Sequence, residues 1–599
     1  MNQQPSSWMH RGVAALGIVM LMHVVLAQPF TWPDAYVADL KPGGTIIEPV
    51  FSDFTSLNYY LADSATERTV LGMTAGPEFL YRDWLGTRAM RDASGAYNGF
   101  FAAHIEELEL ERDFIVTIRE GWTWSDGTPI TMDDVVAGRV IHGDPETQSN
   151  NFACTVVGDD PIAYEVLDDL RIRITLPVAH VNGLWAADCG TMPAHVFMPV
   201  YESGGGAAVA GMWGTATPVS ELVSGGPYIL TEFRPGERLV FERNPSYVYE
   251  LGPDGQPLVG PERWIVTISQ DQNAVLAQVL TGESSFWWPT TLDQVRAIQQ
   301  NVSSGTIGGR LYPNISPSTN VDFLTYNFNN TDPCKAGMFR ESRFRRAMSL
   351  LMDREAMVQG AVGGLGFPAN DMQTSAGAPF DPAYLGELPF DPEEAVTLLR
   401  SLGFTQTGSD GVLRNPTTGC RVEFDVQFNS GNNRRGQLAL IFSQVASEFG
   451  VKVNPREVSV EIWAASITGT EMPRANDHDA NIWGLAGGDV DNPSSRNVVR
   501  IGTNLNSWNK DRNDVAPWEL LMDQLTVQMD AALDVDDRVE IWRQRAEVMR
   551  QNLPLTPMIA ASFHFYENAG NIWPSEHLDA NSIESPYNPG TFRALLMAP

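Results

Sequence analysis

The segment from Phe114 to Val136, FIVTIREGWTWSDGTPITMDDVV, decides the fold, because it places a strand, a tight turn and a helix start in immediate succession. Residues 114–118 are rich in β-branched and aromatic side chains, which predicts a strand. An Asp-Gly pair followed by a proline, at 126–129, supplies the residues that a turn requires. The sequence therefore predicts a strand and a helix that are joined by a turn rich in tryptophan.

Carboxylates gather at the predicted start of this helix. Thr131, with Asp134 three residues later, matches a capping box, and Asp133 is well placed against the positive end of the helix dipole. Adjacent carboxylates can also serve acid/base catalysis, but at a helix start the structural interpretation is strongly favoured. We therefore interpret this segment as structural and not catalytic.

Residues 1–27 have the features of a secretory signal peptide. A single early Arg11 precedes an apolar run, and Val25-Leu-Ala27 before Gln28 forms a cleavage site of small residues. An uncleaved anchor is the alternative, but the run is short for a bilayer span and is interrupted by His23. No cysteine lies near this site to carry a lipid. We expect a periplasmic or otherwise extracytoplasmic protein, released by cleavage and without a lipid anchor.

Length and charge limit the class of protein. The chain of 599 residues is far too long for a single core and suits two or three domains. Its 73 acidic and 40 basic residues give a net charge of −33, which excludes nucleic acid as a partner because phosphates would be repelled. The nine histidines are scattered, so the sequence predicts no metal site and no cofactor.

Three motifs resemble signatures of one protein family. The quoted segment is similar to R-x-G-x-x-W/F-S-D-G-x-P-x-x-x-x-D-V. Residues 223–247 resemble G-x-G-P-Y … L-x-R-N-P-x-Y, although Ser224 stands where glycine is usual and Phe241 replaces leucine, and residues 339–355 resemble F-x-D-x-R-V-R-Q-A-h-x-x-A-I-D-R-E. The family is that of the extracytoplasmic solute-binding proteins, family 5, which serve peptide, nickel and oligosaccharide ABC importers. The residues that match the first signature are Arg119, Gly121, Trp124, Ser125, Asp126, Gly127, Pro129, Asp134 and Val135.

The resemblance implies an α/β fold with two lobes and a hinge, of the periplasmic-binding-protein type II, in the large cluster C form. After the signal peptide it places lobe I, with an extra subdomain, at 28–310, lobe II at 311–499, and a return to lobe I at 500–599. The residues themselves agree with an α/β fold, because a strand at 422–428, a helix at 437–449 and a strand at 451–458 form a β-α-β unit, which implies a parallel sheet. A helix at 271–283 resembles the family helix that ends in Gly-Glu, but Ser285 occupies the place of the usual Asp.

Four cysteines lie in the exported part, where thiols oxidise, and none belongs to a Cys-x-x-Cys motif. We expect two structural disulfides paired in sequence order, Cys154 with Cys189 and Cys334 with Cys420, because this pairing keeps each bridge within one lobe.

Candidate ligand-binding residues follow from the resemblance. The segment 480–493 is similar to the family's W-x-x-D-x-x-x-P cleft loop, which assigns Asp489 the role of receiving the α-ammonium of a peptide, although Trp483 falls three residues too early. The structural alternative for Asp489 is a loop carboxylate that bonds to its own turn. Trp483 and Trp463 could line the pocket or belong to a strand's core face. Arg434 and Arg435 lie near the usual carboxylate-binding region and could meet an acidic group of the ligand.

The sequence lacks the commonest hydrolase and nucleotide-binding motifs: Gly-x-Ser-x-Gly, His-Glu-x-x-His and the P-loop. We therefore expect a protein that performs no chemistry: a monomer that captures peptides between its lobes and delivers them to an ABC permease in the membrane. An oligosaccharide ligand is the alternative within the family, because 16 tryptophans suit sugar stacking. A secreted hydrolase with dispersed catalytic residues is the alternative outside the family.

Overall fold

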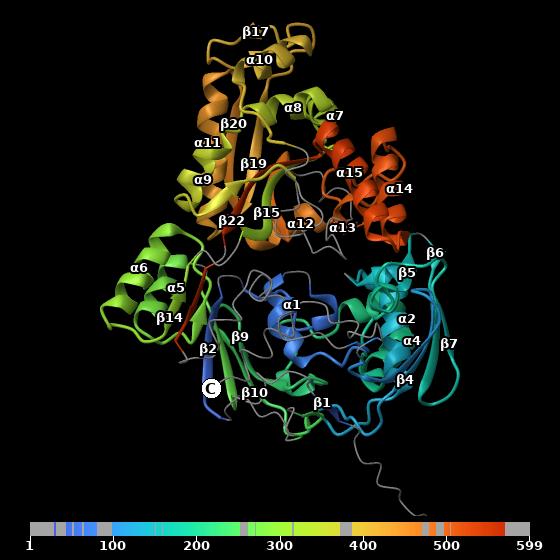
Figure 1. Ribbon diagram of the computed structural model, residues 1–599. Coiled ribbons are helices and arrows are strands. Elements are labelled where there is room, and N and C mark those ends of the chain that lie inside the picture. The colour runs from blue at the N-terminus through green and yellow to red at the C-terminus, as the bar shows by residue number, and fades with distance from the viewer. Residues whose placement is uncertain are drawn as a thin grey trace, which may run out of the picture.

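Two lobes, one above the other in Figure 1, are joined at one side by crossing strands. The structure is a computed structural model, in which the lower lobe holds the N-terminal half and the upper lobe most of the C-terminal half. The residues that it describes are 29–31, 43–50, 53–62, 65–80, 97, 99–149, 151–158, 160–251, 255, 261–269, 271–313, 317–371, 386–469, 478–486, 496–503, 505–562 and 564–568. The predicted signal peptide and Asp489 lie outside these residues.

Lobe I contains two four-stranded sheets. The first has the order β2-β12-β10-β9, and the second has the order β3-β4-β8-β7. The second signature forms a hairpin, because β9 and β10 pair antiparallel around Gly236, whose φ of 71° suits a glycine in a turn. The bounds are β2 Thr45–Val50, β12 Arg263–Ile268, β10 Arg238–Arg243, β9 Tyr228–Arg234, β3 Ala102–Glu109, β4 Asp113–Ile118, β8 Arg171–Thr175 and β7 Ala163–Val166.

Helices and short strands complete this lobe. The helices are α1 Ala65–Leu71, α2 Met132–Gly143, α3 Gly183–Ala186, α4 Ala194–Ala210, α5 Gln272–Leu280 and α6 Leu292–Ser303. The short strands are β1 Phe30–Thr31, β5 Val156–Val157, β6 Asp160–Pro161, β11 Glu250–Leu251, β13 Phe286–Trp287 and β14 Arg310–Tyr312. The helices α5 and α6, with β13 and β14, form a small subdomain at the side of the lobe (Figure 1).

The first two signatures interlock in the core of lobe I. Trp124 is fully buried, and a Cβ on Gly225 would lie 2.5 Å from its ring, so no larger residue fits there. The backbone N–H of Ser125 donates to Ser224 O at 2.8 Å, and Ser224 N–H donates to Ser125 Oγ at 2.9 Å. Asp134 accepts the Thr131 N–H at 2.7 Å, which confirms the predicted helix start. The signature carboxylate is therefore structural.

Lobe II is built on one six-stranded sheet with the order β16-β22-β15-β21-β19-β20. The β-α-β prediction is confirmed, because β19 and β20 pair in parallel and α11 connects them. Cross-strand ion pairs such as Lys452–Glu423, at 2.6 Å, line the edge strand β20. The strand bounds are β15 Pro317–Tyr326, β16 Gly366–Pro368, β19 Glu423–Asn429, β20 Lys452–Val458, β21 Ala480–Ala486 and β22 Leu555–Ser562.

The third signature forms helices α8 and α9, where two of its arginines are buried. Arg345 donates to the carbonyl of Asn552 at 2.8 Å, and Arg354 donates to the carbonyl of Pro557 at 2.9 Å. These two cations therefore satisfy backbone carbonyls of the C-terminal segment. The helices are α7 Pro333–Arg340, α8 Ser342–Leu350, α9 Arg354–Val362, α10 Pro392–Ser401, α11 Asn433–Glu448, α12 Val460–Thr468, α13 Arg496–Val499, α14 Pro517–Ala531 and α15 Val535–Asn552, and a short β17–β18 hairpin spans Gln406–Thr407 and Leu413–Arg414.

The chain returns from lobe II to lobe I later than the sequence suggested. The first crossing lies between Tyr312 and Pro317, next to the expected boundary. The return was expected at residue 500, but α14 and α15 pack against lobe II, and β22 pairs with β15 inside its sheet. The strand β23, Phe565–Glu567, then pairs with β13 and β14 of lobe I. The second crossing therefore lies between Ser562 and Phe565.

Two disulfides stabilise the lobes separately. The predicted order of pairing is confirmed: Cys154–Cys189 lies in lobe I and Cys334–Cys420 in lobe II, with Cα–Cα distances of 5.3 and 5.5 Å.

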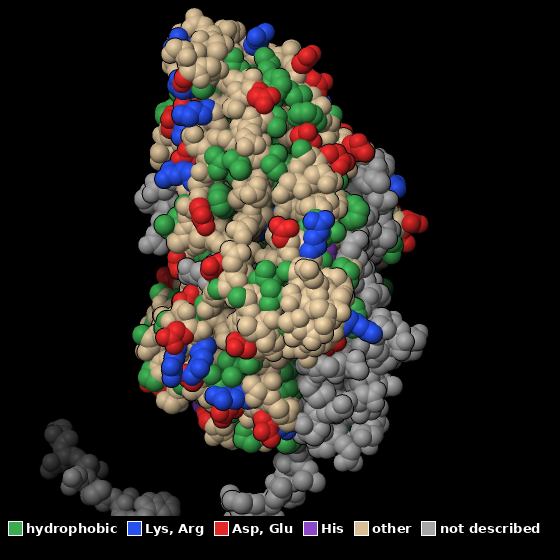
Figure 2. All heavy atoms as spheres, turned by 90° about the vertical axis from the view of Figure 1, so that its left-hand side faces the viewer, with side chains coloured by type: hydrophobic (Ala, Val, Ile, Leu, Met, Phe, Trp, Pro, Cys, Tyr) green, Lys and Arg blue, Asp and Glu red, His purple; other side chains and the backbone are tan. Residues whose placement is uncertain are grey.

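Among the described helices, none has both the length and the apolar character that a bilayer crossing needs. On the face drawn in Figure 2, acidic and basic side chains are interspersed, so this face offers no continuous basic surface.

Candidate functional site

The edge of the lobe II sheet that faces lobe I is the natural place for a ligand. The strand β22 runs toward lobe I, since it continues into β23 there, and pairing through β15 gives β21, β19 and β20 the same direction. The carboxyl ends of these strands and the loops that follow them therefore face lobe I (Figure 1). Ligands of parallel α/β sheets bind at this end of the strands. The helices α11 and α12 begin here, with Asn432 and Ser459 as N-caps.

A buried carboxylate and two arginines occupy this edge. Asp322 is 1 % exposed; its Oδ2 accepts Arg434 Nε–H at 2.6 Å and its Oδ1 accepts Arg435 Nε–H at 3.1 Å. Burial by itself raises the pKa of Asp322, but the charges of Arg434 and Arg435 outweigh burial and hold this pKa below its usual value. The carboxylate is therefore ionised at neutral pH. One anion between two cations leaves this cluster with a net positive charge.

The two arginines differ in the donors that they keep. Arg435 also donates to Asn429 Oδ1 at 2.8 Å, and its guanidinium lies 4.9 Å from the ring centroid of Trp463. Arg434 is held through Nε alone, and its terminal nitrogens have no hydrogen-bond partner among the described residues. Its side chain is 15 % exposed. Arg434 can therefore donate two hydrogen bonds to an anion, whereas Arg435 orients the cluster.

The two tryptophans lie on different faces of the sheet. Trp463 is half-buried on helix α12 and not on a strand, and its Nε1–H donates to Ile482 O at 3.1 Å. Trp483 is 3 % exposed on β21, opposite Phe323, and its Nε1–H donates to Thr325 Oγ1 at 3.0 Å. Since side chains alternate along a strand, Trp483 points away from the face that carries Asp322. The structure thus gathers Arg434, Arg435 and Trp463, and places Trp483 in the core.

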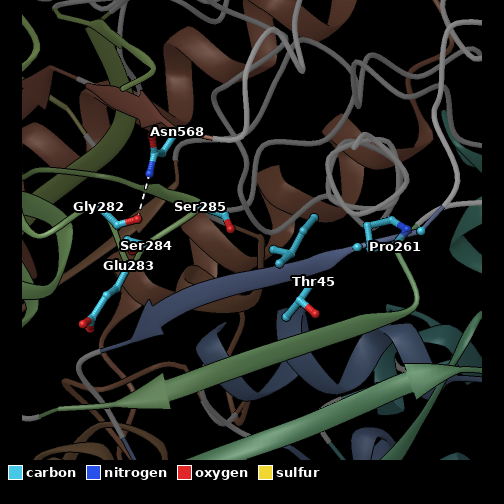
Figure 3. A pocket seen from close by; sticks show the side chains of 10 residues that line it. Thr45, Pro261, Gly282, Glu283, Ser284, Ser285 and Asn568 are labelled. Carbon is cyan, nitrogen blue, oxygen red and sulfur yellow. Dashed lines mark hydrogen bonds between the residues drawn. The ribbon is translucent and has the colours of Figure 1, made fainter. Parts of the chain in front are cut away.

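A cavity of about 230 Å³ lies in lobe I and contains none of the predicted site residues (Figure 3). Its polar walls are largely occupied by internal bonds. Asn568 Nδ2 donates to Gly282 O at 2.9 Å, and Ser285 Oγ accepts the Ile47 N–H at 3.0 Å. Ser285 thus ties the loop after α5 to β2 at the position where the family resemblance has an Asp. The lining residues are Gly43, Gly44, Thr45, Ile46, Pro261, Gly282, Glu283, Ser284, Ser285 and Asn568.

Sequence reasoning missed Asp322, the partner of both arginines. Its sequence distance of 112 residues from Arg434 hid the contact. The available signal was a charged residue with apolar neighbours on both sides, Val321 and Phe323. Within the described part of the chain, no group of three or more His, Cys, Asp or Glu side chains is arranged to hold a metal ion.

Comparisons with known proteins agree with this architecture. Residues 101–507 match the family model described as bacterial extracellular solute-binding proteins, family 5 Middle. A probable ABC transporter-binding protein of Deinococcus radiodurans is 29 % identical over 567 residues, which cover 92 % of this chain and 93 % of that protein.

Solved structures share the fold. The oligopeptide-binding protein AppA of Bacillus subtilis, in complex with a nonapeptide, superposes with a TM-score of 0.73 at 17 % identity and covers 92 % of this chain and 99 % of its own. The periplasmic binding protein MelB of Agrobacterium fabrum, in complex with stachyose, gives a TM-score of 0.76 at 18 % identity, over 92 % and 85 % of the two chains. Both likenesses confirm the two-lobed α/β fold.

Proposed function

This chain belongs to family 5 of the bacterial extracellular solute-binding proteins, and from this premise we propose that it captures peptides between its lobes for an ABC permease in the membrane. Arg434 carries the proposal: Asp322 fixes its Nε, and its terminal nitrogens remain available at the edge that faces lobe I. A carboxylate of the solute would form a bidentate pair with these nitrogens. Support for a peptide comes from the nonapeptide held by a structural neighbour.

Asp489 supplies the second contact in this proposal. Its role rests on the motif resemblance alone, because it lies outside the described residues. An ion pair between Asp489 and the α-ammonium of a peptide would be strong in a poorly hydrated space between the lobes. The protein acts, in this proposal, as a monomer without enzymatic activity, exported by a signal peptide that is cleaved after Ala27 and without a lipid anchor. A turnover assay on peptide and glycoside substrates tests the absence of chemistry, and any turnover that one substitution abolishes would contradict it.

Calorimetry on a peptide pool, with free or amidated carboxyl ends, tests the carboxylate contact. Arg434→Ala should weaken binding of free-acid peptides by about 2–5 kcal/mol, because the buried carboxylate loses its partner. Amidation should cause a similar loss in the wild type and little further loss in Arg434→Ala, since both changes remove one interaction. Additive losses would show that Arg434 does not bind the carboxylate. Trp483→Phe is the control, because its position in the core predicts lower stability with unchanged affinity.

N-acetylated peptides and Asp489→Ala test the amino-terminal contact by the same logic, again with an expected loss of about 2–5 kcal/mol. Unchanged affinity in Asp489→Ala would remove this anchor.

An oligosaccharide is the second candidate solute, because a structural neighbour holds stachyose and Trp463 offers an aromatic ring at the same edge. Tight binding of a neutral oligosaccharide that depends on Trp463 and not on Arg434 would favour this candidate over a peptide. Either solute should raise the melting temperature progressively as its concentration exceeds Kd.

A further inference from the structure

The last turn of α14 joins the lobes at the side opposite the crossing strands. The carbonyl of Asp530 accepts the backbone N–H of Val181 at 2.8 Å, although the two residues belong to different lobes. One turn earlier, Val527 packs on the turn between β5 and β6, where a Cβ on Gly158 would lie 3.9 Å from its methyl groups. Figure 1 shows the lower end of α14 beside β5 and β6, whereas β14 and β22 lie across the molecule.

Side chains reinforce this backbone contact. The Asp530 carboxylate lies 3.9 Å from His180 Nε2, and the two side chains are 7 % and 2 % exposed. His180 Nδ1 accepts the Asn182 N–H at 3.1 Å, so a neutral ring carries its proton on Nε2, the nitrogen that faces Asp530. The contact is therefore polar and buried, with the Nε2–H of the ring facing a carboxylate.

Each partner is fixed to its own lobe. The backbone N–H of His180 donates to Glu111 O at 3.0 Å in the turn between β3 and β4 of lobe I. The helix α14 is held to lobe II through Met522, which is fully buried in that lobe's core. Any rotation of the lobes about the crossing strands must therefore separate Asp530 from Val181, because neither side can follow the other.

We propose that this contact is a latch: Val181 and His180 of lobe I bind Asp530 of lobe II and stabilise the closed arrangement of the lobes. The latch thereby raises the affinity for the solute, although its residues do not contact the solute. Opening exchanges the buried hydrogen bond for bonds to water, so the latch shifts the balance between closed and open forms by the free energy of one buried hydrogen bond and the polar contact between His180 and Asp530. This corresponds to roughly five- to tenfold in the equilibrium constant. The inference does not depend on which solute the protein carries.

Small-angle X-ray scattering of the full protein without added solute tests the latch. Val181→Pro removes the N–H donor, and Asp530→Ala removes the carboxylate, so both variants should populate a more extended form with a larger radius of gyration than the wild type. Asp523→Asn is the matched control, since Asp523 lies on the same helix but pairs with Arg500 inside lobe II, at 2.7 Å. Scattering unchanged in both latch variants, or expansion of the control to the same extent, would overturn the proposal.

A cross-linked variant gives a test that does not weaken the contact. The double substitution Val181→Cys with Asp530→Cys should form a disulfide, because the backbone bond at 2.8 Å brings the two residues together in the closed form. The four native cysteines are already paired, so a thiol assay should find no free thiol in the cross-linked protein. The oxidised variant should keep the compact scattering profile, and reduction should allow expansion. Failure of the new pair to oxidise would show that the lobes do not meet here in solution.

Discussion

The substitution Asp322→Asn tests the central cluster of lobe II. Asparagine keeps the shape of the side chain but removes its charge and replaces one acceptor with a donor that faces a guanidinium. Arg434 and Arg435 then lie together beside the sheet without a compensating anion. We expect a large loss of stability, because Asp322 is 1 % exposed and water cannot replace the lost carboxylate.

The magnitude follows from the two bonds. Each hydrogen bond to a charged group contributes about 1.5–3 kcal/mol, so two bonds at 2.6 and 3.1 Å suggest a loss of roughly 3–6 kcal/mol. Removing one partner from a buried ion pair usually costs about 3–5 kcal/mol, which agrees with this range. Glu423→Gln is the matched control, because Glu423 also lies between two cations, Arg421 at 2.9 Å and Lys452 at 2.6 Å. The side chains of that trio are partly exposed to solvent, so its loss should cost about 1 kcal/mol or less.

Urea unfolding at neutral pH measures both variants. The low pKa of Asp322 means that its contribution to stability is present above the unfolded value of about 3.9 and is lost as the pH falls through the folded pKa. The difference between the wild type and Asp322→Asn should therefore shrink as the pH falls below about 4. A loss in Asp322→Asn no larger than in Glu423→Gln would refute the reasoning that burial makes this cluster strong.

Three further predictions concern stability. Replacing Cys334 and Cys420 together by serine should lower the free energy of unfolding by roughly 4–5 kcal/mol, because the bridge closes a sequence separation of 86 residues, and urea titration measures this. Gly363→Ala should lower the melting temperature, since Gly363 has a φ of 63° and a Cβ there would lie 2.5 Å from Leu292 of lobe I; an unchanged melting temperature would contradict the close approach. Burial raises the pKa of Glu48 from 4.5 to about 8, so stability should fall as the pH rises between these values; Glu48→Gln should flatten this slope, and an equally steep slope in the variant would show that another group causes it.

Local signals predicted local structure well. The start of α2 followed from Thr131 and Asp134, and α10 begins after its Asp391 cap as its own residues indicate. The β-α-β unit of lobe II was readable because its strands and helix have regular hydrophobic patterns. Trp463 was considered a strand residue, yet β20 ends at Val458 and the Ser459 cap starts a helix. A serine cap with an acidic residue in the first turn was the signal that could have corrected this.

Long-range contacts were beyond such reasoning. The sequence indicated Arg434 and Arg435 as candidates to bind an anion, but it could not show that Asp322 neutralises part of their charge and that the terminal nitrogens of Arg434 have no partner among the described residues. The late return of the chain to lobe I was hidden for a similar reason. The helices α14 and α15 are amphipathic, and amphipathicity shows that a helix packs without showing which lobe it packs against.

The position of β23 has a consequence for the order in which the protein assembles during export. This strand is the central member of the three-stranded sheet β13-β23-β14, and it is the last strand described in the chain. The described residues between 317 and 562 belong to lobe II, so that lobe can complete its sheet as soon as β22 has emerged from the translocation channel. Lobe I begins first but finishes last, because the gap between β13 and β14 stays open until residues 565–567 arrive. A nascent chain stalled before β23 would therefore carry a folded second lobe and an unfinished first one.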